Sequence, residues 1–362
     1  MADPILDPAR LADLLAAILA KDGCAEAEAR IVADHLVEAS LRGHDSHGVI
    51  RLTRYHQWLQ TGQLKANQAL RHLSDSGTML HLDGQSGMGQ RLALEATDLG
   101  IERAREHGLC IIALRQAGHI GRLGAYAEQA CAAGMVSIQF VNVGGSRLVA
   151  PFGSSQRAIS TAPIAIGVPN PAGEDFILDF ATSMVAEGKA LVAGRGGKPL
   201  PEDSLITAEG VRTTDPRALY GDSLDSAVPN PRTGPGALRT MGEHKGSGLA
   251  LACELLAGAL TGNGTNGPGD HPYGNGLLSI IVRPDRLDDG HGFGREVAEY
   301  LSFVNGARPE AGVDQVLIPG DPERARRAAR LTGLPVPEPV ISDIEALADT
   351  LGLAAMKAGL RL

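Results

Sequence analysis

The chain has 362 residues, 43% of them hydrophobic, so it is long and apolar enough to build the cores of two domains. A formal net charge of -9, with lysines and arginines scattered along the chain, offers no basic field for a nucleic-acid backbone, and we expect no nucleic-acid partner. No apolar stretch reaches the roughly 20 residues of a bilayer span, and the N-terminus lacks a secretory pattern, so we expect a globular, cytoplasmic protein without membrane contacts.

The first 62 residues show helical periodicity and no strand signal. Asp7 and Pro8 form a typical helix start, and Gly23 is a typical stop. Three helices are predicted here, over residues 8–22, 26–41 and 46–62.

After residue 70 the pattern alternates between strand and helix, which is typical of an α/β fold. Strands are predicted over residues 78–82, 109–115, 136–142, 163–168, 176–180, 277–282 and 315–318, and helices over 92–106, 122–133, 246–260, 296–305, 322–331 and 344–360. Residues 169–173 have the composition of a hairpin turn, which favours a mixed sheet. Residues 194–241 read as long connections, and the C-terminal helices can rejoin the N-terminal ones.

The four cysteines show no CxxC spacing and lie in helical or strand-like surroundings. We therefore predict reduced core thiols, with neither a disulfide framework nor a zinc site. They are Cys24, Cys110, Cys131 and Cys253.

Chemically informative side chains gather between residues 42 and 55. If a helix begins at Ser46, then His47, Arg51 and Tyr55 lie four residues apart on one face. An imidazole, a guanidinium and a phenol on one face can hold a small acid; the alternative is that they cover a solvent-exposed helix.

Glycine-rich turns occur twice. Residues 118–124 lie where a predicted strand passes into a predicted helix, so this turn can either bind a phosphate or serve only as a turn. Residues 84–89 match only half of the dinucleotide-binding fingerprint. His119 lies inside the first turn, where its imidazole can act as acid and base or cap local backbone.

Two further charged residues stand beside predicted elements. Asp179, near the end of an apolar strand, can hold a ribose, an amide or the catalytic imidazole, or cap the next helix. Lys245 precedes an apolar helix and can balance a phosphate or a carboxylate, although solvent-exposed lysines are common.

Five ordered motifs together resemble the family of NAD(P)-dependent malate/L-lactate dehydrogenases. This family is distinct from the Rossmann-type lactate and malate dehydrogenases, and it also contains sulfolactate and ureidoglycolate dehydrogenases and a cyclic-imine reductase. The motifs are Gly43-His44-Asp45-Ser46-His47-Gly48 with Arg51 and Tyr55, then Gly118-His119, Leu178-Asp179-Phe180-Ala181-Thr182-Ser183, His244-Lys245-Gly246-Ser247-Gly248-Leu249-Ala250 and Ile318-Pro319-Gly320-Asp321.

The resemblance implies a homodimer with a mixed-sheet, non-Rossmann cofactor domain, residues 73–309, inserted between helical segments 1–72 and 310–362. It implies that His119 is the proton donor or acceptor and that His47 and Asp179 are also catalytic. The substrate-binding residues implied are Arg51, Tyr55, His44, Asn142 and also His47; the cofactor-binding residues implied are Gly121, Asp179, Ala181, Thr182, Lys245, Pro319, Gly320 and Asp321. Many relatives have Tyr in place of Ser247 and Glu in place of Asp321, so the local cofactor geometry can differ.

We therefore predict reversible hydride transfer between NAD or NADP, with NAD expected first, and a small 2-hydroxy acid such as malate, lactate or sulfolactate. Arg51 would hold the carboxylate and His119 would exchange the hydroxyl proton. Three alternatives stay open: reduction of a cyclic imino acid, a metal-dependent hydrolase that uses His44, Asp45 and His47, and a non-catalytic binding module.

Overall fold

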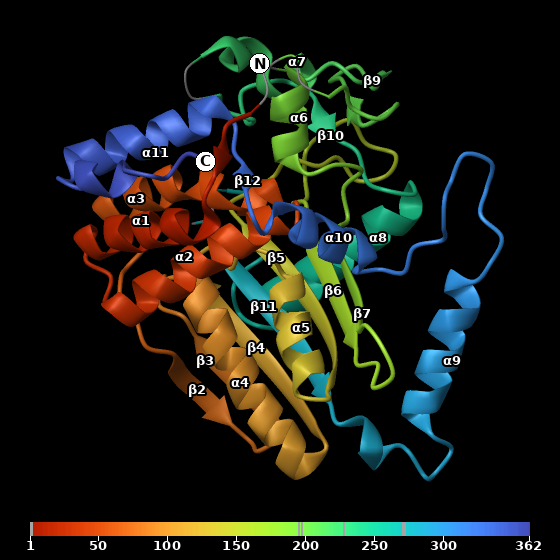
Figure 1. The fold of residues 1–362 in the computed structure, drawn as a ribbon. Helices are drawn as coiled ribbons and strands as arrows, with labels where there is room; N and C mark the ends of the chain where they lie inside the picture. Colours follow the sequence, from red (N-terminus) through yellow and green to blue (C-terminus); the bar gives the residue numbers. More distant parts are fainter. Residues whose placement is uncertain (1–2, 195, 197, 227–228, 270–272) are drawn as a thin grey trace.

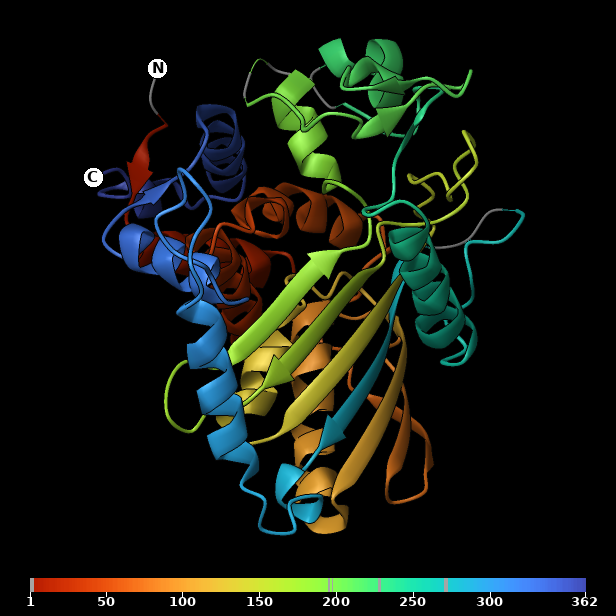
Figure 2. The same ribbon diagram turned by 90° about the vertical axis from the view of Figure 1, so that its right-hand side faces the viewer.

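The protein is described by a computed structural model that covers residues 3–194, 196, 198–226, 229–269 and 273–362. Within this part of the chain the largest sheet has seven strands in the order β2-β3-β4-β11-β5-β6-β7 (Figures 1 and 2). The strands span Arg71–Asp75, Met79–Asp83, Leu109–Ala117, Gly274–Val282, Val136–Gly144, Pro163–Val168 and Phe176–Ala181, in that spatial order. Only the β3 and β4 pairing is parallel among them, so the predicted mixed sheet is confirmed.

Helices cover both faces of this sheet. Helices α4 (Gly89–His107) and α5 (Gly124–Ala132) pack on one face, while α8 (His244–Cys253) and the π-helical turn η4 (Glu254–Ala259) pack on the other (Figure 2). Strand β4 follows α4 after a single residue, Gly108, whose φ of +87° suits a glycine at a helix end. Alternate residues of β4 are buried under α4, which positions the loop that follows β4 at the edge of the helical layer.

The helical layer is built from both ends of the chain. Helices α1 (Pro8–Lys21), α2 (Glu26–Leu41), α3 (Leu52–Gln60) and α11 (Glu338–Thr350) share one hydrophobic core. Strand β1 (Ile5–Leu6) pairs antiparallel with β12 (Leu334–Pro335), so the two ends of the chain lie side by side (Figure 1). The predicted return of the C-terminal helices is therefore confirmed, while the domain boundaries stay a prediction.

The third predicted helix begins later than expected. Residues 45–51 form two short 3₁₀ turns, η1 (Asp45–His47) and η2 (Val49–Arg51), separated by Gly48 in an extended conformation. The Val49 N–H donates to Ser40 Oγ, and a Cβ on Gly48 would lie 1.9 Å from that oxygen. Ser46 caps no helix, and the prediction that three side chains share one helical face was wrong.

Short elements account for the other differences. Residues 315–318 are not a strand, and the last predicted helix ends at Thr350, followed by the 3₁₀ turn η6. Strands of two residues are too short to show an alternating apolar pattern and were not predicted. The edge strand β2 was also not predicted, because its residues are mostly polar. The remaining elements are α6 (Glu187–Gly194), β8 (Leu205–Ile206), β9 (Arg212–Thr213), α7 (Arg217–Tyr220), η3 (Gly221–Asp225), β10 (Ala237–Leu238), η5 (Pro284–Arg286), α9 (Phe293–Asn305), α10 (Asp321–Arg330) and η6 (Ala354–Lys357).

The region predicted as long connections, residues 194–241, contains a small three-stranded sheet, β10-β8-β9. The described residues leave out four positions of this region, namely 195, 197, 227 and 228. They also leave out the first two residues of the N-terminal stretch. All four cysteines are buried and free, as predicted. In the described part of the chain, every helix is too short or too polar to traverse a lipid bilayer.

Candidate active site

Four side chains from four elements form a continuous chain of hydrogen-bond contacts, which we call the histidine chain. It consists of His47 from η1, His119 from the loop after β4, Tyr55 from α3 and Gln90 from the first turn of α4. His47 Nδ1 lies 3.1 Å from His119 Nε2, and Tyr55 Oη lies 2.5 Å from His119 Nδ1. Gln90 Nε2 donates to Tyr55 Oη at 2.6 Å. Residues far apart in sequence therefore meet around one imidazole.

Burial controls the protonation of this chain. Removal from water, and then the positive charge of Arg51, lowers the pKa of both His47 and His119 well below the usual value for histidine. Burial raises the pKa of Tyr55 above its usual value, and Arg51 opposes that rise. At neutral pH both imidazoles are therefore neutral and the phenol keeps its hydrogen.

Access to the two imidazoles differs. His119 is only 8% exposed and both of its ring nitrogens have a partner, whereas His47 is half-buried. Among the described residues, His47 Nε2 has no hydrogen-bond partner. Because His119 occupies Nδ1, a substrate oxygen would have to bind His47 at Nε2.

Within the described residues, the guanidinium of Arg51 has a hydrogen bond at one nitrogen only. Its Nε donates to Ser46 O at 2.5 Å, and no carboxylate of the described residues forms an ion pair with it. Its positive charge contributes to the lowered pKa of both imidazoles. A planar guanidinium held at one nitrogen can bind a small carboxylate through the other two.

The loop at residues 118–124 is tied to four other parts of the protein. Four backbone N–H groups of this loop donate hydrogen bonds of 2.7 to 3.0 Å. They run from residue 118 to Gly87 O, from 120 to Asn275 Oδ1, from 122 to His35 Nε2 and from 124 to Asp179 Oδ2. The Asp179 carboxylate stands at the start of α5, where an anion is favourable. These four N–H groups are not available to a phosphate, and the anion at this helix start is the protein's own.

The half-matching glycine segment, residues 84–89, supports that loop. A Cβ on Gly89 would lie 2.4 Å from Gly118 O and 2.5 Å from His119 O. Only a glycine permits this approach of α4 to the backbone of His119. The glycines therefore position the imidazole.

Most of the predicted cofactor residues lie along β7, some near its start and others just after its end. The Ile177 N–H donates to Pro319 O at 3.1 Å, which places the turn at 318–321 beside the first residues of β7. Asp321 accepts from the Ile318 N–H at 2.8 Å. Asp179 is half-buried, and burial raises the pKa of its carboxyl.

The start of α8 lies at the opposite end of β7. The Met241 N–H donates to Thr182 O at 2.9 Å, so the residues before α8 lie against the chain that leaves β7. Lys245 is exposed and has no ion-pair partner among the described residues. Ser247 Oγ accepts from the Phe152 N–H at 3.0 Å. We call Asp179, Ala181, Thr182, Lys245 and residues 319–321 the β7-edge group; Gly121, the remaining predicted cofactor residue, lies in the 118–124 loop.

Other predicted residues have partners within the protein. His44 Nε2 lies 3.7 Å from Glu323 Oε1, and Asp45 Oδ1 lies 2.8 Å from Arg330 Nη1, so α10 contacts the start of η1 and the residue before it. The metal-site alternative needs His44, Asp45 and His47 to converge. In the described residues the grouping with metal-ligand spacing is a different, mostly exposed one, Asp288, Asp289 and His291.

Asn142 is fully buried on the η4 face of the sheet. Its Nδ2 donates to Glu254 Oε2 at 2.8 Å, and its Oδ1 accepts from Asn263 Nδ2 at 2.7 Å. Both ends of its amide are therefore bonded within the protein. Its predicted role in substrate binding stays a prediction.

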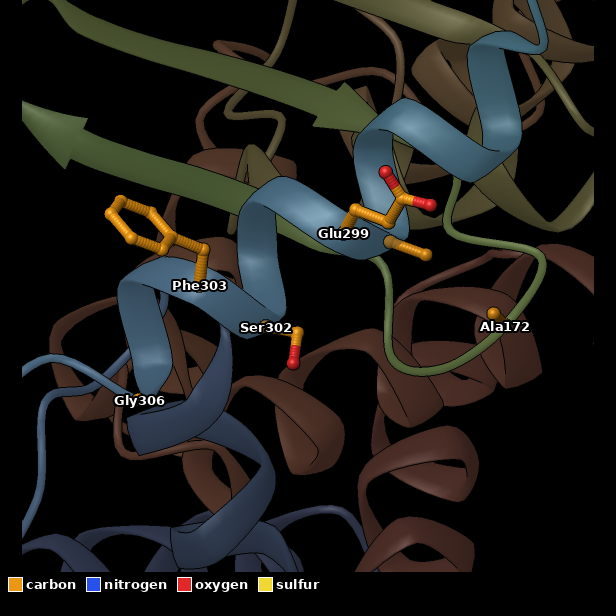
Figure 3. Close-up of a pocket in the computed structure, with 6 residues that line it drawn as sticks. Ala172, Glu299, Ser302, Phe303 and Gly306 are labelled. Atoms are coloured by element: carbon orange, nitrogen blue, oxygen red, sulfur yellow. The ribbon is translucent and has the colours of Figure 1, made fainter.

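A shallow pocket of about 700 Å³ lies elsewhere, between α9 and the β6–β7 turn (Figure 3). Its lining includes Ala172, Glu299, Ser302 and Phe303. No residue of the histidine chain or of the β7-edge group lines it, so we assign it no part in the chemistry.

Known proteins identify the family. The sequence profile described as malate/L-lactate dehydrogenase matches residues 6–345. The chain belongs to the malate/L-lactate dehydrogenase family. It is 37% identical to an L-lactate dehydrogenase of Cupriavidus necator over 330 residues, which cover 89% of this chain and 91% of that protein.

Two further members of the malate/L-lactate dehydrogenase family broaden the comparison. The solved sulfolactate dehydrogenase of Methanocaldococcus jannaschii has a TM-score of 0.84 at 31% identity and covers 96% of this chain and 98% of its own. A Delta(1)-pyrroline-2-carboxylate/Delta(1)-piperideine-2-carboxylate reductase of Pseudomonas putida is 31% identical over 354 residues, or 94% of this chain and 95% of that protein. The predicted family and fold class are confirmed, and the protein is an enzyme of this family of NAD(P)-dependent 2-hydroxy acid dehydrogenases.

Sequence reasoning missed several residues that hold this site together. Gln90, Asn275 and His35 lie outside the five motifs, and Gln90 and His35 stand among other polar residues of amphipathic helices. Glu323 stands two residues after the last recognised motif. Only a polar residue at an expected core position could have drawn attention to Gln90 or His35.

Proposed function

We propose that this enzyme transfers a hydride reversibly between NAD or NADP and a small 2-hydroxy acid, with Arg51 binding the carboxylate of the acid. The observation that carries the proposal is the histidine chain together with Arg51, which has no carboxylate partner in the part of the chain that the structure describes. The acid would lie between Arg51 and His47 Nε2, a position that brings a carboxylate to the guanidinium and the adjacent oxygen to the imidazole.

The proton of the hydroxyl would be exchanged by the histidine pair. We predict His119 to be essential, because it bonds both to His47 and to Tyr55. His47 Nε2 is the nitrogen that a substrate oxygen would have to bind, so the proton would enter there while His119 sets the basicity of His47 from behind. Their lowered pKa keeps both imidazoles neutral at neutral pH, so that each ring has one nitrogen with a hydrogen and one nitrogen that can accept.

The cofactor would lie along the β7-edge group and Gly121. Thr182 and the residues before α8 are in contact, and the turn at 319–321 lies against β7, which supports one continuous binding surface. Lys245, which is exposed and forms no ion pair with any described residue, would supply a cation for a phosphate. When bound, the nicotinamide supplies or accepts the hydride at C2 of the acid. The preference for NAD, the homodimer and the cytoplasmic location stay predictions.

Reduction of a cyclic imino acid is the second candidate. The observation that favours it is the similarity to the Pseudomonas putida reductase, whose name states such substrates. Arg51 would bind the ring carboxylate, and the histidine pair would face the ring nitrogen in place of the carbonyl oxygen.

One experiment separates the two candidates. A panel of 2-oxo acids and cyclic imino acids is offered with reduced NAD and with reduced NADP, and absorbance of the reduced nicotinamide is followed. Oxidation with pyruvate, oxaloacetate or sulfopyruvate supports the first candidate, and oxidation with imino acids alone supports the second. A protein that oxidises neither cofactor with any of these acids would contradict both.

A further inference from the structure

The histidine chain ends at an amide with one unsatisfied atom. Gln90 is 1% exposed; its Nε2 donates to Tyr55, while its Oε1 is buried and has no hydrogen-bond partner among the described residues. Reversing this amide would place Oε1 toward Tyr55 and leave Nε2 without a partner. Since each orientation makes one hydrogen bond to the phenol and leaves one end unbonded, the two are closer in energy than for a fully bonded amide.

The observed orientation of the Gln90 amide sets the donor-to-acceptor direction of every hydrogen bond in the histidine chain. A phenol has a single hydrogen, and because Gln90 donates to Tyr55 Oη, that hydrogen is free to point at His119 Nδ1. A neutral His119 then carries its hydrogen on Nε2 and donates to His47 Nδ1. A neutral His47 in turn carries its hydrogen on Nε2, the nitrogen that a substrate oxygen would have to bind.

The reversed amide gives the opposite direction. Oε1 would accept the phenol hydrogen, so Tyr55 Oη would accept from His119 Nδ1. His119 Nε2 would then accept from His47 Nδ1, and His47 Nε2 would present a lone pair.

We propose that Gln90 is a positioning residue whose amide orientation sets the tautomers of His119 and His47, and thereby whether His47 Nε2 meets the substrate as a donor or as an acceptor. The inference rests on the proposed function, in which a 2-oxo acid brings a carbonyl acceptor and a 2-hydroxy acid brings a hydroxyl donor. The two orientations of one amide therefore match the two substrates of a reversible reaction.

Two substitutions lock the chain in opposite directions. In Gln90→Glu, assayed above pH 8 so that the new carboxylate is ionised, residue 90 can only accept, which forces the reversed direction. In Gln90→Met, a side chain of similar length offers Tyr55 no partner, and the phenol then donates to His119. Gln129→Met is the matched control, because Gln129 also packs against α4 and also has a buried Oε1 without a partner among the described residues, yet lies outside the histidine chain.

The first readout is the histidine tautomer itself. Long-range proton–nitrogen NMR spectra of the full chain labelled with ¹⁵N-histidine distinguish Nε2–H from Nδ1–H. We expect Nε2–H for both histidines in the free wild type and in Gln90→Met, and Nδ1–H for both in Gln90→Glu. Identical tautomers in all three proteins would overturn the proposal.

The second readout is a pair of dissociation constants. Pyruvate is titrated into the protein with oxidised cofactor and L-lactate into the protein with reduced cofactor, so that neither mixture reacts. Relative to lactate, pyruvate should bind about 3-fold to 10-fold more tightly in Gln90→Met and about 3-fold to 10-fold more weakly in Gln90→Glu. This change corresponds to roughly one hydrogen bond. An unchanged ratio of the two constants in both variants, equal to that of Gln129→Met, would contradict the inference. A tautomer change in a protein that binds neither these two acids nor any other 2-oxo acid of the panel would support the role of Gln90 and contradict the proposed function.

Discussion

The histidine chain and the β7-edge group differ in how they are built. In the first, His47, Tyr55, Gln90 and His119 bond to one another in a buried setting. In the second, main-chain contacts hold the turns together, and Lys245 remains exposed.

Burial explains this division of labour. A group that exchanges a proton needs a shifted pKa and a set orientation, and both follow from burial and from bonded neighbours. A surface that binds and releases a large anionic cofactor must be accessible to that cofactor. Exposure to solvent costs such a surface little binding free energy. The comparison predicts large effects for substitutions in the histidine chain and small, salt-sensitive effects at the β7 edge.

The largest expected effect is that of His119→Ala. Since His119 bonds to both His47 and Tyr55, its removal disconnects the acid/base pair. We expect kcat to fall by about 10²-fold to 10⁴-fold, the usual contribution of a positioned acid or base. Steady-state assays of nicotinamide oxidation measure this, with His72→Ala on the exposed strand β2 as the control. Full activity of His119→Ala would remove the histidine from the mechanism.

Arg51→Lys comes next. A lysine keeps the charge but replaces a two-pronged contact with a single point, so about one charge-assisted hydrogen bond is lost. We expect kcat/KM for the acid to fall about 10-fold to 100-fold, equivalent to about 1.5 to 3 kcal/mol, with an unchanged melting temperature. Arg54→Lys, on the exposed side of α3, serves as the control. Equal kinetics in the two variants would show that Arg51 does not hold the carboxylate.

His35 tests how burial shifts a histidine pKa, through the pH dependence of the free energy of unfolding. Its Nε2 accepts from the Arg122 N–H, and burial, followed by the charge of Arg122, lowers the pKa of His35 from 6.5 to about 3. Below pH 6.5 the unfolded chain binds this proton and the folded chain does not, so the free energy of unfolding decreases as the pH falls.

We expect this one group to contribute about 1.4 kcal/mol per pH unit between pH 6.5 and 4. In His35→Gln the amide oxygen still accepts from Arg122 but does not titrate, so the slope should be shallower by that amount. Urea unfolding at pH 7, 6 and 5 measures the slopes, with His72→Gln as the control. Parallel slopes in wild type and His35→Gln would show that His35 titrates normally in the folded protein.

Lys245→Ala should have the smallest effect. An exposed charge contributes about 0.2 to 1 kcal/mol, so we expect the KM for the cofactor to rise about 2-fold to 5-fold at low salt while kcat stays the same. The increase should disappear at high ionic strength. Titration of the cofactor at two salt concentrations tests this, with the exposed Lys65→Ala as the control. A large fall in kcat would place Lys245 in the chemistry instead.

The sequence by itself determined most of the local structure. Apolar periodicity located α1, α2, α4 and α5 and the central strands, because those segments bury one face and repeat accordingly. The five motifs determined the family, since their residue types recur in a specific order along the chain.

The tertiary structure alone decided which side chains meet. Gly48 breaks the predicted helix because Ser40 of α2 lies against it, and no local pattern records that contact. Gln90 reaches Tyr55 across 35 positions, and Asn275 reaches the N–H of residue 120 across 155. Periodicity reports on neighbours within one element, whereas these hydrogen bonds depend on how separate elements pack, so the orientation of the acid/base pair was settled only by the folded chain.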